Sequence, residues 1–150
     1  MSAARSTAAR AVGPPEPRTS GLPPWRADGG ELLVNEIFYS IEGEGIRVGE
    51  PTTFVRLSGC NLRCRFCDTE FGTGGPMAVD AVCAEVQRHP ARWVCLTGGE
   101  PLGQNLEPLA RALRGAGYRL HIETNGTLRP APVLFALIEH WTVSPKHPPL

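Results

Sequence analysis

The stretch WVCLTGGEPLGQNLEPLARALRGAGYRLHIET, residues 93–124, decides the fold class. It opens with a short apolar run at 93–97, continues with leucine and alanine at helical spacing over 106–113, and ends with alternating apolar and polar residues over 118–124. Gly115 follows the helical part, as is typical of a helix C-terminus. A strand, a helix and a strand in this order predict two parallel strands joined by a right-handed crossover.

The same alternation continues on both sides of this stretch. Further strands are predicted at 52–58 and 141–143, and further helices at 79–86 and 133–138. Strands that alternate with helices indicate an α/β fold with a parallel sheet. Four such strands make only part of a barrel, and no predicted helix covers the edge of the last one. We therefore expect a partial (β/α) barrel that lacks its C-terminal strands.

Two regions of different character divide the chain. Residues 1–30 are rich in alanine, arginine and proline and show no apolar periodicity, so they cannot bury enough surface to offset the entropy of ordering. We expect a disordered tail there, although its composition also faintly resembles an organelle transit peptide. Residues 31–150 are expected to form one domain, which opens with a strand at 32–39 and a glycine-rich turn at 40–45.

Composition argues against several classes of protein. Of the 150 residues, 41% are hydrophobic and 20% are charged, which is an ordinary balance for a globular domain. The longest uninterrupted apolar run, residues 133–138, is far shorter than the roughly 20 residues of a membrane span, so no membrane association is expected. The formal net charge is zero, which argues against nucleic-acid binding through a basic surface.

Three of the five cysteines, Cys60, Cys64 and Cys67, lie within eight positions. A disulfide scaffold spreads its pairs, so this clustering indicates a metal or redox site in a reducing compartment, and hence a cytoplasmic protein. The C-x3-C-x2-C spacing leaves open a cubane iron–sulfur cluster with one free iron, a zinc site, or coincidence. Cys83, on a helical apolar stripe, and Cys95, within a strand, are predicted to be small buried hydrophobic side chains and not a fourth ligand.

Polar motifs follow three neighbouring predicted strands. The cysteine cluster follows the first, residues 98–101 (GGEP) the second and residues 123–126 (ETNG) the third. Because ligands of parallel α/β folds bind at the carboxyl ends of the strands, these motifs are expected to share one rim. Glu123 has the strand parity of His121 and is opposite to Leu120, which predicts that it points into the interior. The histidines themselves are assigned no role.

The cysteine spacing matches the signature of the radical S-adenosylmethionine enzymes, and the GGEP turn resembles a second motif of that superfamily. Further motifs narrow the resemblance to the 7-carboxy-7-deazaguanine synthase family, in whose order they occur. They are IEGEG (41–45), FVRLSGC (54–60), CDT (67–69), TGGEP (97–101), ETNG (123–126) and SPK (144–146).

This resemblance implies an iron–sulfur lyase. A flavodoxin or ferredoxin supplies one electron to a 4Fe–4S cluster, S-adenosylmethionine is cleaved homolytically, and the resulting radical acts on 6-carboxy-5,6,7,8-tetrahydropterin. The product is 7-carboxy-7-deazaguanine, formed with loss of ammonia in the biosynthesis of queuosine and related 7-deazapurines. The family also implies a magnesium ion and a homodimer.

The same resemblance implies roles for the matching residues. Cys60, Cys64 and Cys67 hold the cluster, and Thr69 contributes to the magnesium site. The cofactor contacts are Gly98, Gly99, Glu100, Glu123, Ser144 and Lys146. The substrate contacts are Glu42, Glu44, Arg56 and Thr97.

Several of these roles also have a reason in the residues themselves. Gly98 and Gly99 have no side chain, so their backbone can approach a cofactor closely. Arg56 lies in a strand between apolar residues, so its guanidinium should meet an anion or reach solvent. Glu42 stands where family members often carry glutamine, and a carboxylate can accept a hydrogen bond from a pterin but cannot donate one.

Two alternatives from other classes remain open at this point. The chain resembles, in its cysteine and glycine-rich motifs, other radical enzymes such as glycyl-radical activases. It also fits a zinc-binding module or an inactive metal-binding fragment. Reaction with the pterin would distinguish the synthase from other radical enzymes. Bound iron in place of zinc would distinguish it from a zinc-binding module.

Overall fold

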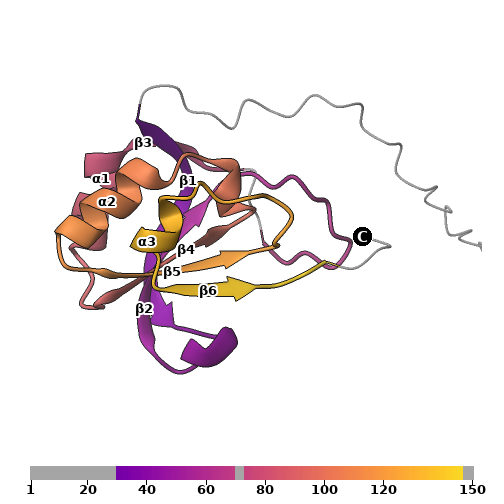
Figure 1. The fold of residues 1–150 in the computed structure, drawn as a ribbon, viewed down its shortest axis with the longest axis horizontal. Helices are drawn as coiled ribbons and strands as arrows, with labels where there is room; N and C mark the ends of the chain where they lie inside the picture. The colour runs from indigo at the N-terminus through magenta and orange to yellow at the C-terminus, as the bar shows by residue number, and fades with distance from the viewer. Residues whose placement is uncertain (1–29, 70–72, 147–150) are drawn as a thin grey trace, which may run out of the picture.

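The computed structural model describes residues 30–69 and 73–146, which form one six-stranded sheet with three α-helices (Figure 1). The tail predicted at 1–30 lies outside the described residues, except for Gly30. The strands are β1 (Glu31–Ile41), β2 (Pro51–Leu57), β3 (Gly75–Ala78), β4 (Trp93–Gly98), β5 (Arg119–Thr124) and β6 (His140–Val143). The helices are α1 (Val79–Val86), α2 (Glu107–Gly115) and α3 (Leu134–Leu137), with the 3-10 turns η1 (Gly45–Arg47) and η2 (Pro101–Gly103).

The predicted parallel sheet is confirmed for β2, β4, β5 and β6, which lie side by side in the order β3-β1-β2-β4-β5-β6. β1 runs antiparallel to both of its neighbours, a direction that no periodicity had indicated. β3 was not predicted, because its sequence GPMA is short and contains glycine and proline, which suits only an edge strand. The described strands form an open sheet with β6 at one edge, in keeping with a partial barrel.

One face of the sheet is aliphatic and is covered by the helices, which Figure 1 shows together on one side. The side chains of Val55, Leu96 and Ile122 are fully buried against Leu109 and Leu113 of α2 in one hydrophobic core. The predicted helix at 133–138 forms only the single turn of α3, whose Leu134 joins that core. Burial of these side chains is the main term that stabilises the domain.

The opposite face of the parallel strands is polar. Successive side chains of a strand point to opposite faces, so Phe54, Cys95 and His121, which are paired in register, form one row on this face. Arg56 and Thr97 form part of the next row towards the carboxyl ends. Since the aliphatic residues occupy the other face, this face is free to carry chemistry.

The β1–β2 loop, residues 42–50, folds back over the polar face. Its ends are joined by hydrogen bonds from the Glu42 N–H to the Glu50 carbonyl and from the Gly49 N–H to the Glu42 carbonyl, both 2.9 Å. The Arg47 guanidinium lies 3.3 Å from the centre of the Trp93 ring. A Cβ on Gly45 would lie 2.6 Å from the Thr142 hydroxyl oxygen, so the loop also reaches the edge strand β6. The loop therefore encloses the space in front of the sheet.

The longest helix among the described residues is α2, with nine residues. A membrane-spanning helix needs roughly 20 predominantly apolar residues. No helix in the part of the chain that the structure describes therefore meets the requirement for crossing a bilayer.

Candidate active site

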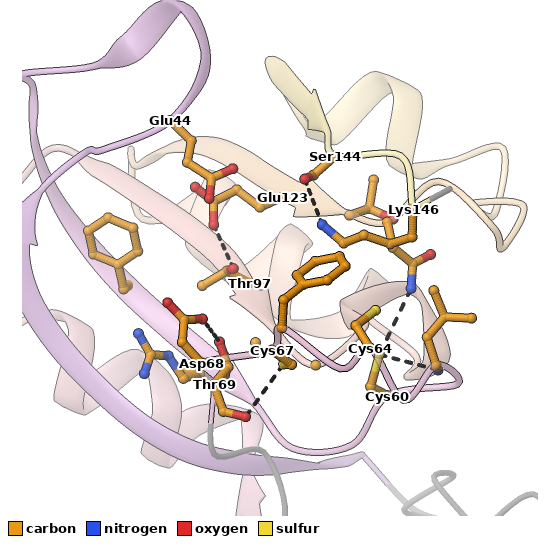
Figure 2. Close-up of a pocket in the computed structure, with 18 of the residues that line it drawn as sticks. Glu44, Cys60, Cys64, Cys67, Asp68, Thr69, Thr97, Glu123, Ser144 and Lys146 are labelled. Atoms are coloured by element: carbon orange, nitrogen blue, oxygen red, sulfur yellow. Dashed lines mark hydrogen bonds between the residues drawn. The ribbon is translucent and has the colours of Figure 1, made fainter. Parts of the chain in front are cut away.

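A cavity of about 560 Å³ opens at the carboxyl ends of β2, β4, β5 and β6 (Figure 2). The three motifs predicted to share one rim all contribute to its wall, which confirms that prediction. Twelve of the fourteen residues singled out from the sequence line it, namely Glu44, Arg56, Cys60, Cys64, Cys67, Thr69, Thr97, Gly98, Gly99, Glu123, Ser144 and Lys146. Glu42 and Glu100 are buried instead and do not line the cavity.

The cysteine loop forms one wall of the cavity. None of its three thiols is in a disulfide, and the Cys67 N–H donates to the Cys64 carbonyl at 3.2 Å, which closes a turn between these two residues. The Cys60 sulfur accepts hydrogen bonds from the Leu62 N–H at 3.4 Å and from the Asn125 amide at 3.9 Å. Burial raises the pKa of the Cys60 thiol, and the hydrogen bond from the Leu62 N–H opposes that rise.

These thiols fit an iron–sulfur cluster. Three unpaired cysteines of one loop face one cavity, and N–H groups directed at the Cys60 sulfur are the kind of hydrogen bond that stabilises cluster thiolates. Cys83 is half-buried on α1 and packs against the aliphatic core, as predicted. Cys95 is fully buried among the hydrophobic residues of the protein, as predicted, although it lies on the other face of the sheet from the main aliphatic cluster.

The glycines of the β4 turn are required by the packing of the protein itself. A Cβ on Gly98, whose φ is +125°, would lie 2.1 Å from the Leu57 carbonyl oxygen. A Cβ on Gly99 would lie 1.9 Å from the carbonyl oxygen of Gly59. The turn is pressed directly onto the segment that leads into Cys60, so it positions the cysteine loop as well as lining the cavity.

Glu100 connects the two motifs that follow β4 and β5. Its carboxylate accepts hydrogen bonds from the Leu102 N–H at 3.0 Å, from the Thr124 hydroxyl at 2.8 Å and from the Asn125 N–H at 2.8 Å. The side chain is fully buried behind the rim, where a bound cofactor could not reach it without displacing these donors. Glu100 is a structural contact that holds the rim together, and its expected contact with the cofactor stays a prediction.

Glu123 points into the interior, as its strand parity predicted, and accepts a 2.6 Å hydrogen bond from the Thr97 hydroxyl. Burial raises the pKa of its carboxyl group to about 7, against the lowering effect of Thr97 and with a further increase from neighbouring Glu42. In Figure 2 the Glu44 side chain extends from the β1–β2 loop toward Glu123. These groups can therefore exchange hydrogen bonds with a polar ligand between them.

Glu42 and His121 lie beneath Glu44. One carboxylate oxygen of Glu42 accepts the Glu44 N–H at 3.0 Å, and the other lies 3.1 Å from Nδ1 of His121. Burial lowers the pKa of His121 to about 4, partly opposed by Glu42. Glu42 was expected to touch substrate, but the structure places it where it supports Glu44. His121 was assigned no role, although its parity with Glu123 was the signal that could have identified it.

The remaining predicted residues line the cavity at its edges. Arg56 meets an anion, as expected, because its Nη1 lies 2.6 Å from the Glu36 carboxylate on β1. Lys146 donates a 2.7 Å hydrogen bond to the Ser144 hydroxyl just beyond β6. The Thr69 hydroxyl donates to the Asp68 carboxylate at 3.4 Å, which puts two oxygen ligands side by side next to Cys67.

The sequence did not single out several residues that also line the cavity. Asn125 belongs to the motif at 123–126, so its neighbours could have indicated it. Phe38 and Phe54 stack with their ring centres 5.1 Å apart. That pair depends on the antiparallel register of β1 and β2, for which the sequence contained no signal.

Comparison with known proteins agrees with this site. The family model for the radical SAM superfamily matches residues 54–142. The chain is 50% identical over 113 residues to the 7-carboxy-7-deazaguanine synthase of Bacteroides thetaiotaomicron, covering 75% of this chain and 60% of that protein. It is 48% identical over 105 residues to the 7-carboxy-7-deazaguanine synthase of Rhodospirillum rubrum, covering 67% of this chain and 45% of that protein.

A solved structure shows the same arrangement of elements. The crystal structure of QueE from Escherichia coli superimposes with a TM-score of 0.66 at 31% identity, covering 79% of this chain and 61% of that one. The chain spans about half the length of the curated relatives it matches. The predicted resemblance to the 7-carboxy-7-deazaguanine synthases is thereby confirmed.

Proposed function

The chain belongs to the radical S-adenosylmethionine superfamily, and from this premise we propose that it acts as a 7-carboxy-7-deazaguanine synthase. The reaction converts 6-carboxy-5,6,7,8-tetrahydropterin to 7-carboxy-7-deazaguanine with loss of ammonia, in the biosynthesis of queuosine and related 7-deazapurines. The observation that carries the proposal is the single cavity in which the cysteine loop meets the motif residues that the synthase family shares.

In this proposal Cys60, Cys64 and Cys67 hold a 4Fe–4S cluster. When bound, the cluster supplies the electron for cleavage of S-adenosylmethionine, which provides the radical that acts on the pterin. The backbone of Gly98 and Gly99 contacts the cofactor across a surface with no side chains. The cofactor's amino and hydroxyl groups are held by Glu123, Ser144 and Lys146, which face the cavity from β5 and from the segment after β6.

The pterin occupies the part of the cavity lined by Glu44, Arg56 and Thr69. Arg56 supplies a positive charge near a substrate carboxylate, and Glu44 accepts hydrogen bonds from ring N–H groups. Thr97 donates a hydrogen bond that holds Glu123 between the S-adenosylmethionine cofactor and the pterin. Glu42 and Glu100 act as positioning residues, through Glu44 and through Asn125 respectively.

The remaining partners are those that the family resemblance implies. A magnesium ion, which prefers oxygen ligands, is held by Thr69 beside Asp68 together with the substrate carboxylate. The electron donor is a flavodoxin or ferredoxin in the cytoplasm, which approaches over the exposed Phe66 and Cys67 of the cysteine loop. The enzyme is a homodimer in this proposal.

Anaerobic reconstitution of the full chain with iron and sulfide tests the proposal. We expect about four irons per chain and binding of 6-carboxytetrahydropterin in the presence of S-adenosylmethionine and magnesium. Mass spectrometry after addition of the reductant measures how much of the pterin is converted. The matched control is Cys64→Ser treated in the same way. Zinc in place of iron would refute the cluster. Cofactor cleavage without binding of the pterin would refute the substrate and favour another radical enzyme, such as a glycyl-radical activase.

A further inference from the structure

We propose that the protein binds a second metal, a transition-metal ion of the Zn²⁺ class, at an interior cluster formed by Glu42, Cys95, His121 and Glu123. One ligand atom of each residue lies within 4.8 Å of the others. Three of the residues are buried and Glu123 is half-buried, reaching the cavity as well. The interior cluster lies between the β1–β2 loop and the polar face of β4 and β5, apart from the three cysteines of the iron–sulfur site.

Two atoms of the interior cluster lack the hydrogen bonds that buried polar atoms normally have. Oε2 of Glu42 and Nδ1 of His121 are inaccessible to solvent, and neither makes an aligned hydrogen bond with any described residue. They face each other at 3.1 Å, on side chains that are 1% and 0% exposed. Buried polar groups in proteins are nearly always satisfied, and a metal ion bound by both atoms would satisfy the two together.

The opposite atoms of these side chains are anchored. Nε2 of His121 lies 2.8 Å from the Thr142 hydroxyl, and Oε1 of Glu42 accepts the Glu44 N–H at 3.0 Å. Oε2 of Glu123 accepts the Thr97 hydroxyl at 2.6 Å. Outer partners of this kind fix the orientation of metal ligands in proteins and leave the other nitrogen or oxygen for the ion. The interior cluster therefore already has the second layer of contacts that a metal site needs.

The charges and donor types of the interior cluster favour a borderline transition metal. Two carboxylates and a thiol are brought together, and the one buried guanidinium among the described residues, that of Arg47, is already bonded to Glu50 and Thr52. A divalent cation would offset the negative charge. One nitrogen, one sulfur and two carboxylate oxygens match the tetrahedral preference of Zn²⁺, whereas magnesium prefers oxygen ligands alone.

Cobalt titration tests the site without interference from the iron–sulfur cysteines. The starting protein is the full chain with Cys60→Ser, Cys64→Ser and Cys67→Ser. We expect one equivalent of Co²⁺ to bind with a thiolate-to-cobalt absorption band, and Zn²⁺ to displace it. Adding Cys95→Ser should abolish the band and weaken binding at least tenfold. Adding Cys83→Ser, which removes a cysteine outside the interior cluster, should leave both unchanged.

A second variant tests the role of the outer contacts. Thr142→Val keeps all four ligands and removes the hydroxyl that lies 2.8 Å from Nε2 of His121 and 3.4 Å from Nε2 of His140, so cobalt affinity should fall about 10–100-fold. Should the triple-serine chain fail to fold, zinc content is measured on the wild-type chain after its cysteine loop has been loaded with iron and sulfide. One zinc per chain that is lost in Cys95→Ser supports the proposal.

Two results would overturn it. One is that neither the triple-serine chain nor the wild-type chain loaded with iron and sulfide retains stoichiometric zinc or cobalt. The other is that binding persists unchanged in Cys95→Ser. Either result would make the interior cluster an ordinary buried polar network. Neither would affect the proposed synthase activity, because iron content and pterin consumption are measured separately.

Discussion

The backbone N–H of Asn125 donates a 2.8 Å hydrogen bond to Oε2 of Glu100. The two residues belong to motifs that follow different strands, β4 and β5, and the hydrogen bond fixes the distance between them. The Asn125 side chain in turn contacts the Cys60 sulfur at 3.9 Å. A buried carboxylate thus connects the glycine-rich turn, the β5 motif and the cysteine loop.

We predict that Glu100→Ala lowers the free energy of unfolding by about 3 kcal/mol or more. The substitution leaves three donors without their charged acceptor, two of them backbone N–H groups. Urea denaturation measures the effect. Glu107→Ala, which removes an exposed carboxylate on α2, is the control and should cost less than about 1 kcal/mol. A Glu100→Ala protein as stable as this control would show that the buried contact contributes little.

We predict that Gly99→Ala destabilises the domain and disturbs cluster assembly, because its Cβ would lie 1.9 Å from a backbone oxygen that cannot move aside cheaply. Overpacking of this kind costs about 1–3 kcal/mol. Gly115→Ala is the matched control, since no atom lies within 4 Å of its added Cβ, and it should be neutral or slightly stabilising. Thermal unfolding and iron content measure both effects. Equal melting temperatures for the two variants would contradict the packing argument.

We predict that Cys60, Cys64 and Cys67 are each required for an oxygen-sensitive iron–sulfur cluster. Single replacements by serine, followed by iron and sulfide analysis, should each remove most of the cluster. Cys83→Ser and Cys95→Ser should retain it, because neither residue lines the cavity. Full cluster content in Cys64→Ser would sink the assignment of the ligands.

We predict that Arg56 acts on the pterin and not on cofactor cleavage. Loss of a charge-assisted contact to a ligand costs about 1.5–3 kcal/mol, so Arg56→Ala should weaken pterin binding by one to two orders of magnitude. Formation of 5′-deoxyadenosine with dithionite and without pterin should persist. Arg111→Ala, an exposed arginine on α2, is the control. If Arg56→Ala loses uncoupled cleavage while its cluster is intact, the arginine serves the cofactor or the fold.

We predict that Glu123 and His121 have opposite effects on the pH dependence of stability in chelator-treated protein. The pKa of Glu123 is raised from 4.5 to about 7, so the folded protein holds a proton that the unfolded chain has lost, and stability falls as pH rises through this window. The pKa of His121 is lowered from 6.5 to about 4, so stability rises between these values.

Two variants separate these contributions. Glu123→Gln removes the contribution to stability that decreases as pH rises. The free energy of unfolding should therefore increase more steeply with pH between about 4.5 and 6.5 than it does in the wild type. His121→Gln should show the reverse, a decrease over the same range. Urea denaturation at a series of pH values measures both. Parallel curves for wild type and both variants would mean that these groups titrate normally in the folded protein.

Much of the fold was readable from local patterns. Periods of two and 3.6 residues identified the strand at 119–124 and the helix at 107–115 within two residues of their ends. The short, proline-containing β3 and the direction of β1 were not readable, because pairing between strands depends on partners that local periodicity does not record.

The candidate site divides in the same way. The sequence by itself determined the three-cysteine loop and the two motifs after β4 and β5, since parallel strands bring their carboxyl ends to one rim whatever path the loops take. Only the tertiary structure decided that Glu42 lies behind Glu44, that Glu100 is buried, and that Cys95 and His121 meet across β4 and β5. The physical reason is contact between residues far apart in sequence. The β1–β2 loop folds over the polar face at Glu42, the β5 motif closes over Glu100, and the parallel register of β4 and β5 pairs Cys95 with His121.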